Sequence, residues 1–151
     1  MVKRFIQEVR FARKITHENV IRIFDFIAVG ESYAISMEYF PSHALTADLT
    51  GIPMPIPRAF TILQGICRGM SVAHRAGIIH RDLKPANVLL NEHDLVKIVD
   101  FGVAAAGRSG DPRLTASGLV VGTPSYMAPE QAQGGAVDPR TDIYSLGVFM
   151  Y

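Results

Sequence analysis

The sequence has little cysteine and no long apolar run, and each of these absences excludes a class of protein. Cys67 is the only cysteine, so no disulfide can form within the chain, and a reducing compartment is expected. Its place in a helical apolar pattern favours core packing over a role as a nucleophile. No stretch approaches the roughly twenty apolar residues of a membrane-spanning helix. Lys3 and Arg4 are not followed by the apolar block of a signal peptide. We therefore expect a soluble, cytoplasmic chain without a membrane segment.

An excess of charge of one sign is also missing. The chain has 15 Lys and Arg residues and 14 Asp and Glu residues, which gives a net charge of +1. This balance argues against nucleic acid as a partner and predicts no strong electrostatic steering of a ligand. With 151 residues, 48% of them apolar, the chain is long enough to bury roughly two-thirds of its surface in one domain.

The most informative stretch is residues 78–87, Ile-Ile-His-Arg-Asp-Leu-Lys-Pro-Ala-Asn. It brings a carboxylate, Asp82, close in sequence to the ammonium of Lys84 and the amide of Asn87. Pro85 excludes a helix through the middle and favours an extended residue before it, which predicts a shaped loop. In such a loop the carboxylate can take a proton from a hydroxyl, the cation can offset phosphate charge, and the amide oxygen can hold Mg²⁺. The pattern therefore suits the transfer of a phosphoryl group.

Two further motifs follow in order along the chain. Residues 95–99 have the composition of a buried strand and lead directly into Asp-Phe-Gly at residues 100–102. Residues 122–130 then read Gly-Thr-Pro-Ser-Tyr-Met-Ala-Pro-Glu. Together with residues 78–87, these motifs resemble the catalytic loop, the metal-binding segment and the end of the activation segment of protein kinases. Met-Ala-Pro-Glu-Gln-Ala at residues 127–132 and the short spacings are most similar to eukaryotic-like (Hanks-type) serine/threonine kinases of bacteria.

This resemblance implies an α+β, protein-kinase-like fold of which residues 1–151 form a part. Residues 1–40 would be the remnant of the small lobe and the hinge, and residues 41–151 would be the large lobe through helix F. The Gly-rich phosphate loop, the strand with the nucleotide-binding lysine and the C-terminal helices would be missing. The isolated chain is therefore expected to be weakly active or inactive.

Residue periodicity predicts the elements that would build this fold. Helices are expected over residues 3–15, 60–73 and 142–151, and hairpins over residues 20–28 with 33–38 and 88–90 with 95–99. Gly77 suits the end of the second helix. Prolines at positions 41, 53, 55 and 57 predict a linker with at most a short helix. The third helix is apolar almost all round, so it should be buried, or expose an apolar patch where it has no packing partner.

The resemblance also implies roles in catalysis. Asp82 would be the catalytic base, and Lys84 would contact the transferred phosphate. Thr123 would bond to both of them. Asn87 and Asp100 would hold Mg²⁺, with Mn²⁺ as an alternative, because hard cations take oxygen ligands.

On the ATP side, the resemblance implies five residues. Glu8, within an apolar helical stripe, would pair with the missing lysine, although from the pattern alone it could be a solvated edge residue. Met37 would be the gatekeeper beside the adenine, a role that is compatible with ordinary core filling. The backbone from Glu38 to Phe40 would bond the adenine edge, and Leu89 would pack beneath the ring.

A further group would shape and regulate the site. His80 and Phe101 would stack in an internal apolar spine that Asp142 anchors, and Glu130 would pair with an arginine outside this chain. His74 is expected to be structural.

Arg81, just before the catalytic aspartate, typically accompanies control by activation-loop phosphorylation, because an arginine there needs an anionic partner. Thr115 and Ser117 would be the modified residues, unless they are solvated hydroxyls without a role.

Lysine two positions after Asp82, together with Gly-Thr-Pro, favours a serine/threonine kinase that transfers the γ-phosphate of ATP to protein hydroxyls. Two alternatives remain: a non-catalytic kinase-like binding module and a small-molecule phosphotransferase. The intact Asp82, Lys84, Asn87 and Asp100 argue against the first. The Ala-Pro-Glu segment and His-Arg-Asp in place of His-Gly-Asp argue against the second.

Overall fold

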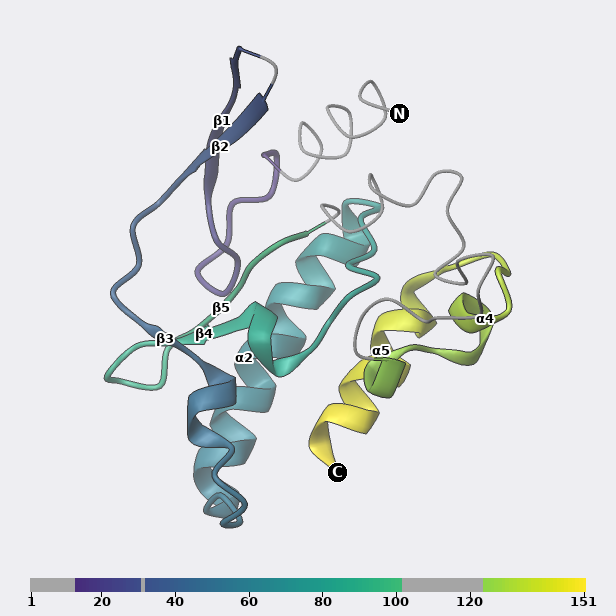
Figure 1. Cartoon of the computed structure of the whole chain (residues 1–151). Coiled ribbons are helices and arrows are strands. Elements are labelled where there is room, and N and C mark those ends of the chain that lie inside the picture. Colours follow the sequence, from purple (N-terminus) through teal and green to yellow (C-terminus); the bar gives the residue numbers. More distant parts are fainter. Residues whose placement is uncertain (1–12, 31, 102–123) are drawn as a thin grey trace.

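The structure, a computed structural model, describes residues 13–30, 32–101 and 124–151 (Figure 1). Its strands are β1 (Ile23–Val29), β2 (Ser32–Met37), β3 (His43–Ala44), β4 (Val88–Leu90) and β5 (Val96–Ile98). Its helices are α2 (Ile56–Arg75), α4 (Pro129–Ala132) and α5 (Pro139–Met150), with 3₁₀ turns at Leu45–Asp48, Pro85–Asn87 and Pro124–Tyr126. The architecture is α+β. No helix within these described ranges is long and apolar enough to cross a membrane.

The first predicted hairpin is present. β1 and β2 pair antiparallel from Ile23 opposite Met37 to Val29 opposite Ser32, and the connection turns at Gly30 with a φ of 60°. Glycine adopts this left-handed backbone conformation at no steric cost, which suits it to a turn between two strands. The hairpin stands at one end of the molecule, and residues 38–42 lead from it to β3 and α2 (Figure 1).

The second sheet is built around β5. β3, β4 and β5 pair antiparallel in that order, which includes the predicted second hairpin. On the other side of β5, the backbone N–H of Ile98 donates to Asn19 O and Ile21 N–H donates to Ile98 O, both at 2.9 Å. The Asn19 side chain adds a bond to Val96 O at 3.0 Å. The segment before the first hairpin is therefore bonded to β5, the strand that leads into Asp100.

α2 ends where the sequence predicted. Gly77 has a φ of 74°, its N–H bonds His74 O, and Ile78 N–H bonds Ala73 O, both at 2.9 Å. This pair of bonds is a Schellman motif, which satisfies the last carbonyls of the helix.

The prediction that Cys67 packs in the core was wrong. Cys67 is exposed, and 58% of the surface of Phe60 is accessible. The buried stripe of α2 instead follows six other residues: Ile62, Gly65, Ile66, Gly69, Met70 and Ala73. Its two glycines let α2 lie directly against Asn19 and β5, and this contact turns Cys67 to the flank of the helix.

The two terminal helices also differ from their predictions. Residues 13–15 form a turn and loop and do not continue the helix expected over residues 3–15, most of which lies outside the described residues. α5 buries Thr141, Asp142 and Ser145 but exposes Ile143 and Met150. α5 is therefore not buried all round, and its exposed Ile143 and Met150 agree with the other expectation, an apolar patch where the helix has no packing partner. Its inner face is polar because Asp142 accepts hydrogen bonds from the backbone of the loop over residues 78–87.

Substitution of Gly69 by alanine tests the contact between α2 and β5. A Cβ at this position would lie 2.8 Å from Asn19 O and 2.9 Å from the Ile98 side chain. We expect Gly69→Ala to lower the free energy of unfolding by about 1–3 kcal/mol, as overpacking does. Gly147→Ala is the matched control, because nothing lies within 4 Å of a Cβ there. It should be neutral or stabilising by up to about 1 kcal/mol, since alanine favours a helix. Equal effects in urea denaturation would contradict this packing.

Candidate active site

The loop over residues 78–87 has the shape that its proline predicted. Lys84 is extended, with φ −159° and ψ 163°, and a 3₁₀ turn begins at Pro85. Leu83 is fully buried and holds the loop against the core. Lys84 Nζ lies 2.8 Å from Asp82 Oδ2, and Asn87 Nδ2 donates to Asp82 O at 2.8 Å. The ammonium of Lys84 and the amide of Asn87 therefore both lie within hydrogen-bond distance of Asp82.

The arrangement leaves oxygen atoms for a cation. Because the amide nitrogen of Asn87 donates within the loop, its carbonyl oxygen is the atom that can bind a metal ion. Asp100, just after β5, is exposed. No group of three or more His, Cys, Asp or Glu side chains that could hold a metal occurs in the part of the chain that the structure describes. An amide and a carboxylate fit a Mg²⁺-type ion, which keeps several waters and takes further oxygens from phosphates.

His80 connects this loop to the strand that leads to Asp100. Its side chain is completely buried. The Asp82 N–H donates to Nδ1 at 3.3 Å, so Nε2 carries the proton that is donated to Val99 O at 2.9 Å. The imidazole also packs on Phe101, with ring centroids 4.8 Å apart and planes tilted by 57°. The two segments that carry Asp82 and Asp100 are thus joined through one side chain.

The electrostatics of His80 place both carboxylates near it. Burial lowers the pKa of His80, while the charges of Asp142, Asp82 and Asp100 act in the opposite direction. Because burial outweighs the three charges, the imidazole stays neutral, as its two hydrogen bonds require. The charges of Asp82 and Asp100 thus both reach the same imidazole.

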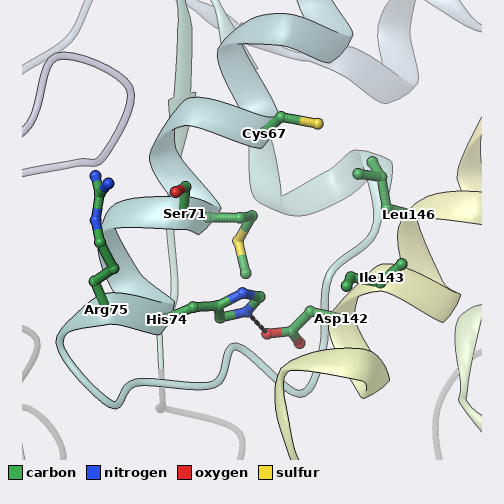
Figure 2. Close-up of a pocket in the computed structure, with 8 residues that line it drawn as sticks. Cys67, Ser71, His74, Arg75, Asp142, Ile143 and Leu146 are labelled. Atoms are coloured by element: carbon green, nitrogen blue, oxygen red, sulfur yellow. Dashed lines mark hydrogen bonds and ion pairs between the residues drawn. The ribbon is translucent and has the colours of Figure 1, made fainter.

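Asp142, from α5, holds the backbone of the loop. Its Oδ2 accepts from His80 N–H at 2.9 Å and its Oδ1 from Arg81 N–H at 2.8 Å. Arg81 has a φ of 67°, a left-handed conformation that costs an ordinary residue about 1–2 kcal/mol. Oδ2 also lies 2.8 Å from His74 Nε2 on α2 (Figure 2). His74 therefore has the structural role expected of it.

A cavity of about 440 Å³ lies between α2 and α5. Figure 2 shows the His74–Asp142 pair at one side of it and Cys67 at another. Of the predicted site residues that the structure describes, Asp142 alone lines this cavity, and the cavity lies apart from Asp82, Lys84, Asn87 and Asp100, which do not line it.

The segment before α5 is also tied to the loop. Gln131 Nε2, on α4, donates to Arg81 O at 2.8 Å. Glu130, half-buried, accepts from Thr141 Oγ1 at 2.6 Å, so its partner in this structure is a hydroxyl. Sequence reasoning noted Gln131 only as part of a family motif. Its contact could not be found from spacing, because it joins residues 50 positions apart.

Two of the predicted adenine-binding residues, Glu38 and Phe40, contact Lys97, a side chain that the sequence analysis did not single out. Lys97 Nζ, on β5, lies 2.8 Å from Glu38 Oε1 and 5.4 Å from the centroid of the Phe40 ring. Leu89 is the neighbour of Lys97 across the β4–β5 pair. Met37 is 41% exposed, so its interpretation as core filling was wrong.

Four predicted site residues lie outside the described residues: Glu8, Thr115, Ser117 and Thr123.

Titration of His80 gives a prediction about stability. Its folded pKa lies below its ordinary value of 6.5, so its contribution is fully present above about pH 6.5 and is lost as the pH falls toward the folded pKa. His80→Phe should be less stable at neutral pH by about 1–3 kcal/mol, because two hydrogen bonds are lost. Its Tm should fall less than that of the parent between about pH 7.5 and pH 5.5.

His93→Phe is the control, because the side chain of His93 is 79% exposed. It should follow the parent at both pH values. The same acid-induced fall in Tm in His80→Phe and in the parent would contradict the assignment to His80.

The family model for the protein kinase domain matches residues 1–151. The serine/threonine-protein kinase pkn2 of Myxococcus xanthus is 40% identical over 100% of this chain, which covers 19% of that relative. The DNA damage-responsive serine/threonine-protein kinase RqkA of Deinococcus radiodurans is 39% identical over 98% of the chain and 23% of the relative. The chain thus spans about a fifth of the length of these curated relatives.

Among solved structures, the kinase domain of Mycobacterium tuberculosis PknI matches with a TM-score of 0.78. It is 27% identical, and the match covers 99% of this chain and 55% of that one.

Proposed function

The chain belongs to the protein kinase family, and we propose that the protein carrying it transfers the γ-phosphate of ATP to serine or threonine hydroxyls of protein substrates. The resemblance to bacterial serine/threonine kinases and the α+β, kinase-like fold expected from the sequence are confirmed. Members of this family use ATP and a divalent metal ion. Mg²⁺ is the proposed ion, with Mn²⁺ as the alternative, because the oxygen donors of Asn87 and Asp100 suit hard cations.

The observation that carries this proposal is the short set of contacts within residues 82–87. Asp82 accepts the proton of the attacking hydroxyl, which makes the oxygen a better nucleophile as it attacks phosphorus. Lys84, 2.8 Å from Asp82, offsets charge on the transferred phosphoryl group. Asn87 and Asp100 hold the metal ion, which when bound neutralises charge on the phosphate oxygens.

In this proposal, residues 37–40 and Leu89 bind the adenine end of the nucleotide. Met37 and Leu89 contact the ring, and free backbone groups of residues 38–40 bond its edge. The N–H of Glu38 donates to Arg22 O at 2.9 Å, so the remaining backbone groups are the ones available. Residues 37–40 and Leu89 thus bind the base, while Lys84, Asn87 and Asp100 act at the phosphate end.

Several roles stay predictions. These are the bond of Thr123 to Asp82 and Lys84, the pairing of Glu8 with a lysine, and the division between residues 1–40 and 41–151. The phosphorylation of Thr115 and Ser117, with Arg81 as the cation that pairs with the phosphate, also stays a prediction. The spine of His80 and Phe101 on Asp142 is supported by their contacts.

Substitution of Asp82 tests the proposed function. In the full-length protein, Asp82→Asn should lower kcat for phosphorylation of a serine-containing peptide about 10²–10⁴-fold, because the general base is lost. Affinity for ATP should change little, since Asp82 is not proposed to bind the base or the metal ion. Transfer of labelled phosphate measures the rate.

Glu92→Gln removes a carboxylate that is 84% exposed in the β4–β5 turn, and it should behave as the parent. Near-parental kcat in Asp82→Asn would remove Asp82 from its role.

A further inference from the structure

We propose that Lys97 is a positioning residue that sets nucleotide selectivity, because it holds residues 38–40 against β5 in a fixed position relative to Asp100. This inference rests on the proposed function, since it requires a nucleotide whose base lies against residues 38–40. Residues 38–40, which are proposed to bind the base, and Asp100, which is proposed to hold the metal ion, are then both attached to β5.

The contact between Lys97 and Glu38 is partly shielded from water. The Lys97 side chain is 11% exposed and that of Glu38 is 25% exposed, with Nζ and Oε1 2.8 Å apart. Glu38 Oε1 also accepts from Arg22 N–H at 2.7 Å, and Glu38 N–H donates back to Arg22 O. Glu38 is thus held by β5 on one side and by the residue before β1 on the other.

The same ammonium contacts the other end of this segment. Lys97 Nζ lies 5.4 Å from the centroid of the Phe40 ring, within the range of a cation–π interaction. Phe40 O accepts from Ser42 Oγ at 2.8 Å, which fixes the peptide that follows. One side chain therefore restrains both Glu38 and Phe40, and with them the backbone groups proposed to meet the purine.

Strand register connects this restraint to the metal end of the site. Lys97 lies opposite Leu89, and directly opposed residues of neighbouring strands share a face of the sheet. Val96 and Ile98, on the other face, are buried in the core and fix the strand. Asp100 lies two residues after the end of β5. A shift of residues 38–40 relative to β5 would thus change the span between the base and the phosphates.

The charge state of Glu38 fits this role. Burial alone would raise the pKa of the Glu38 carboxyl, but the hydrogen bonds from Lys97 and from Arg22 N–H lower it below its ordinary value. The carboxylate therefore stays ionised at neutral pH. Removal of the ammonium would leave a half-buried carboxylate with a single donor, an arrangement that favours reorientation of residues 38–40 toward water.

The test is Lys97→Met in the full-length protein, which keeps the aliphatic stem and removes the charge. We expect kcat/KM for ATP to fall about tenfold, largely through KM, because one charge-assisted contact is lost. The preference for ATP over GTP should fall with it, since the backbone groups that distinguish the two bases are displaced. Lys97→Arg should retain most of the parent's kcat/KM for ATP and most of its preference for ATP over GTP. A fluorescent ADP, titrated without metal ion, should bind Lys97→Met more weakly by a similar factor.

Two comparisons separate positioning from a general loss of stability. Glu38→Gln should reproduce the loss of selectivity, and the double variant should be no worse than either single one, because both remove the same contact. Lys14→Met removes an exposed lysine and should leave KM and selectivity unchanged.

An unchanged ATP-to-GTP ratio and unchanged ADP affinity in Lys97→Met and Glu38→Gln would overturn the inference, even if Tm falls. If the parent phosphorylates the peptide in that case, the proposed function survives and only the role of Lys97 fails. A parent that binds no nucleotide at all would overturn both.

Discussion

The buried carboxylate of Asp142 is the constraint on which the candidate site depends. Both of its oxygens accept backbone N–H groups, from His80 and from Arg81, and these bonds hold Arg81 in a left-handed conformation. Each N–H would cost about 1–3 kcal/mol if it were left buried without an acceptor. This requirement explains why α5, otherwise apolar, presents polar residues to the core. It also explains why the loop leaves His80 inside the protein while Asp82 stays partly exposed.

From His80 the restraint passes to the strand that carries the other half of the site. The imidazole donates to Val99 O and packs on Phe101, so the residues on both sides of Asp100 are fixed. β5 is in turn held by α2 through the close approach at Gly65 and Gly69. The loop that carries Asp82, the strand that leads to Asp100 and the helix that carries Asp142 thus form one rigid support, although they lie far apart in the sequence. Rigid supports of this kind are what positioned acid–base and metal chemistry requires.

The sequence predicted the parts of this arrangement that local chemistry determines. Pro85 dictates an extended Lys84 and Gly77 ends α2. Strand-forming residues on either side of a turn locate both hairpins. Each of these features depends on neighbouring residues alone. The failures all involve tertiary contacts. Cys67 lies on the flank of α2 because the glycines of that helix, rather than its larger side chains, make the closest approach. The positive φ of Asp100 and the pairing of Lys97 with Glu38, 59 residues away, leave no mark on the local pattern.

The central claim is that Asp82 and Asp100 act on the phosphates of a single nucleotide. The most direct measurement is a crystal structure of the full-length protein with Mg²⁺ and a non-hydrolysable ATP analogue. We expect one nucleotide whose terminal phosphate lies beside Asp82, with the metal ion bound by Asn87 and Asp100 and the base against residues 38–40. A nucleotide that contacts one of the two aspartates while the other faces away from it would contradict the account.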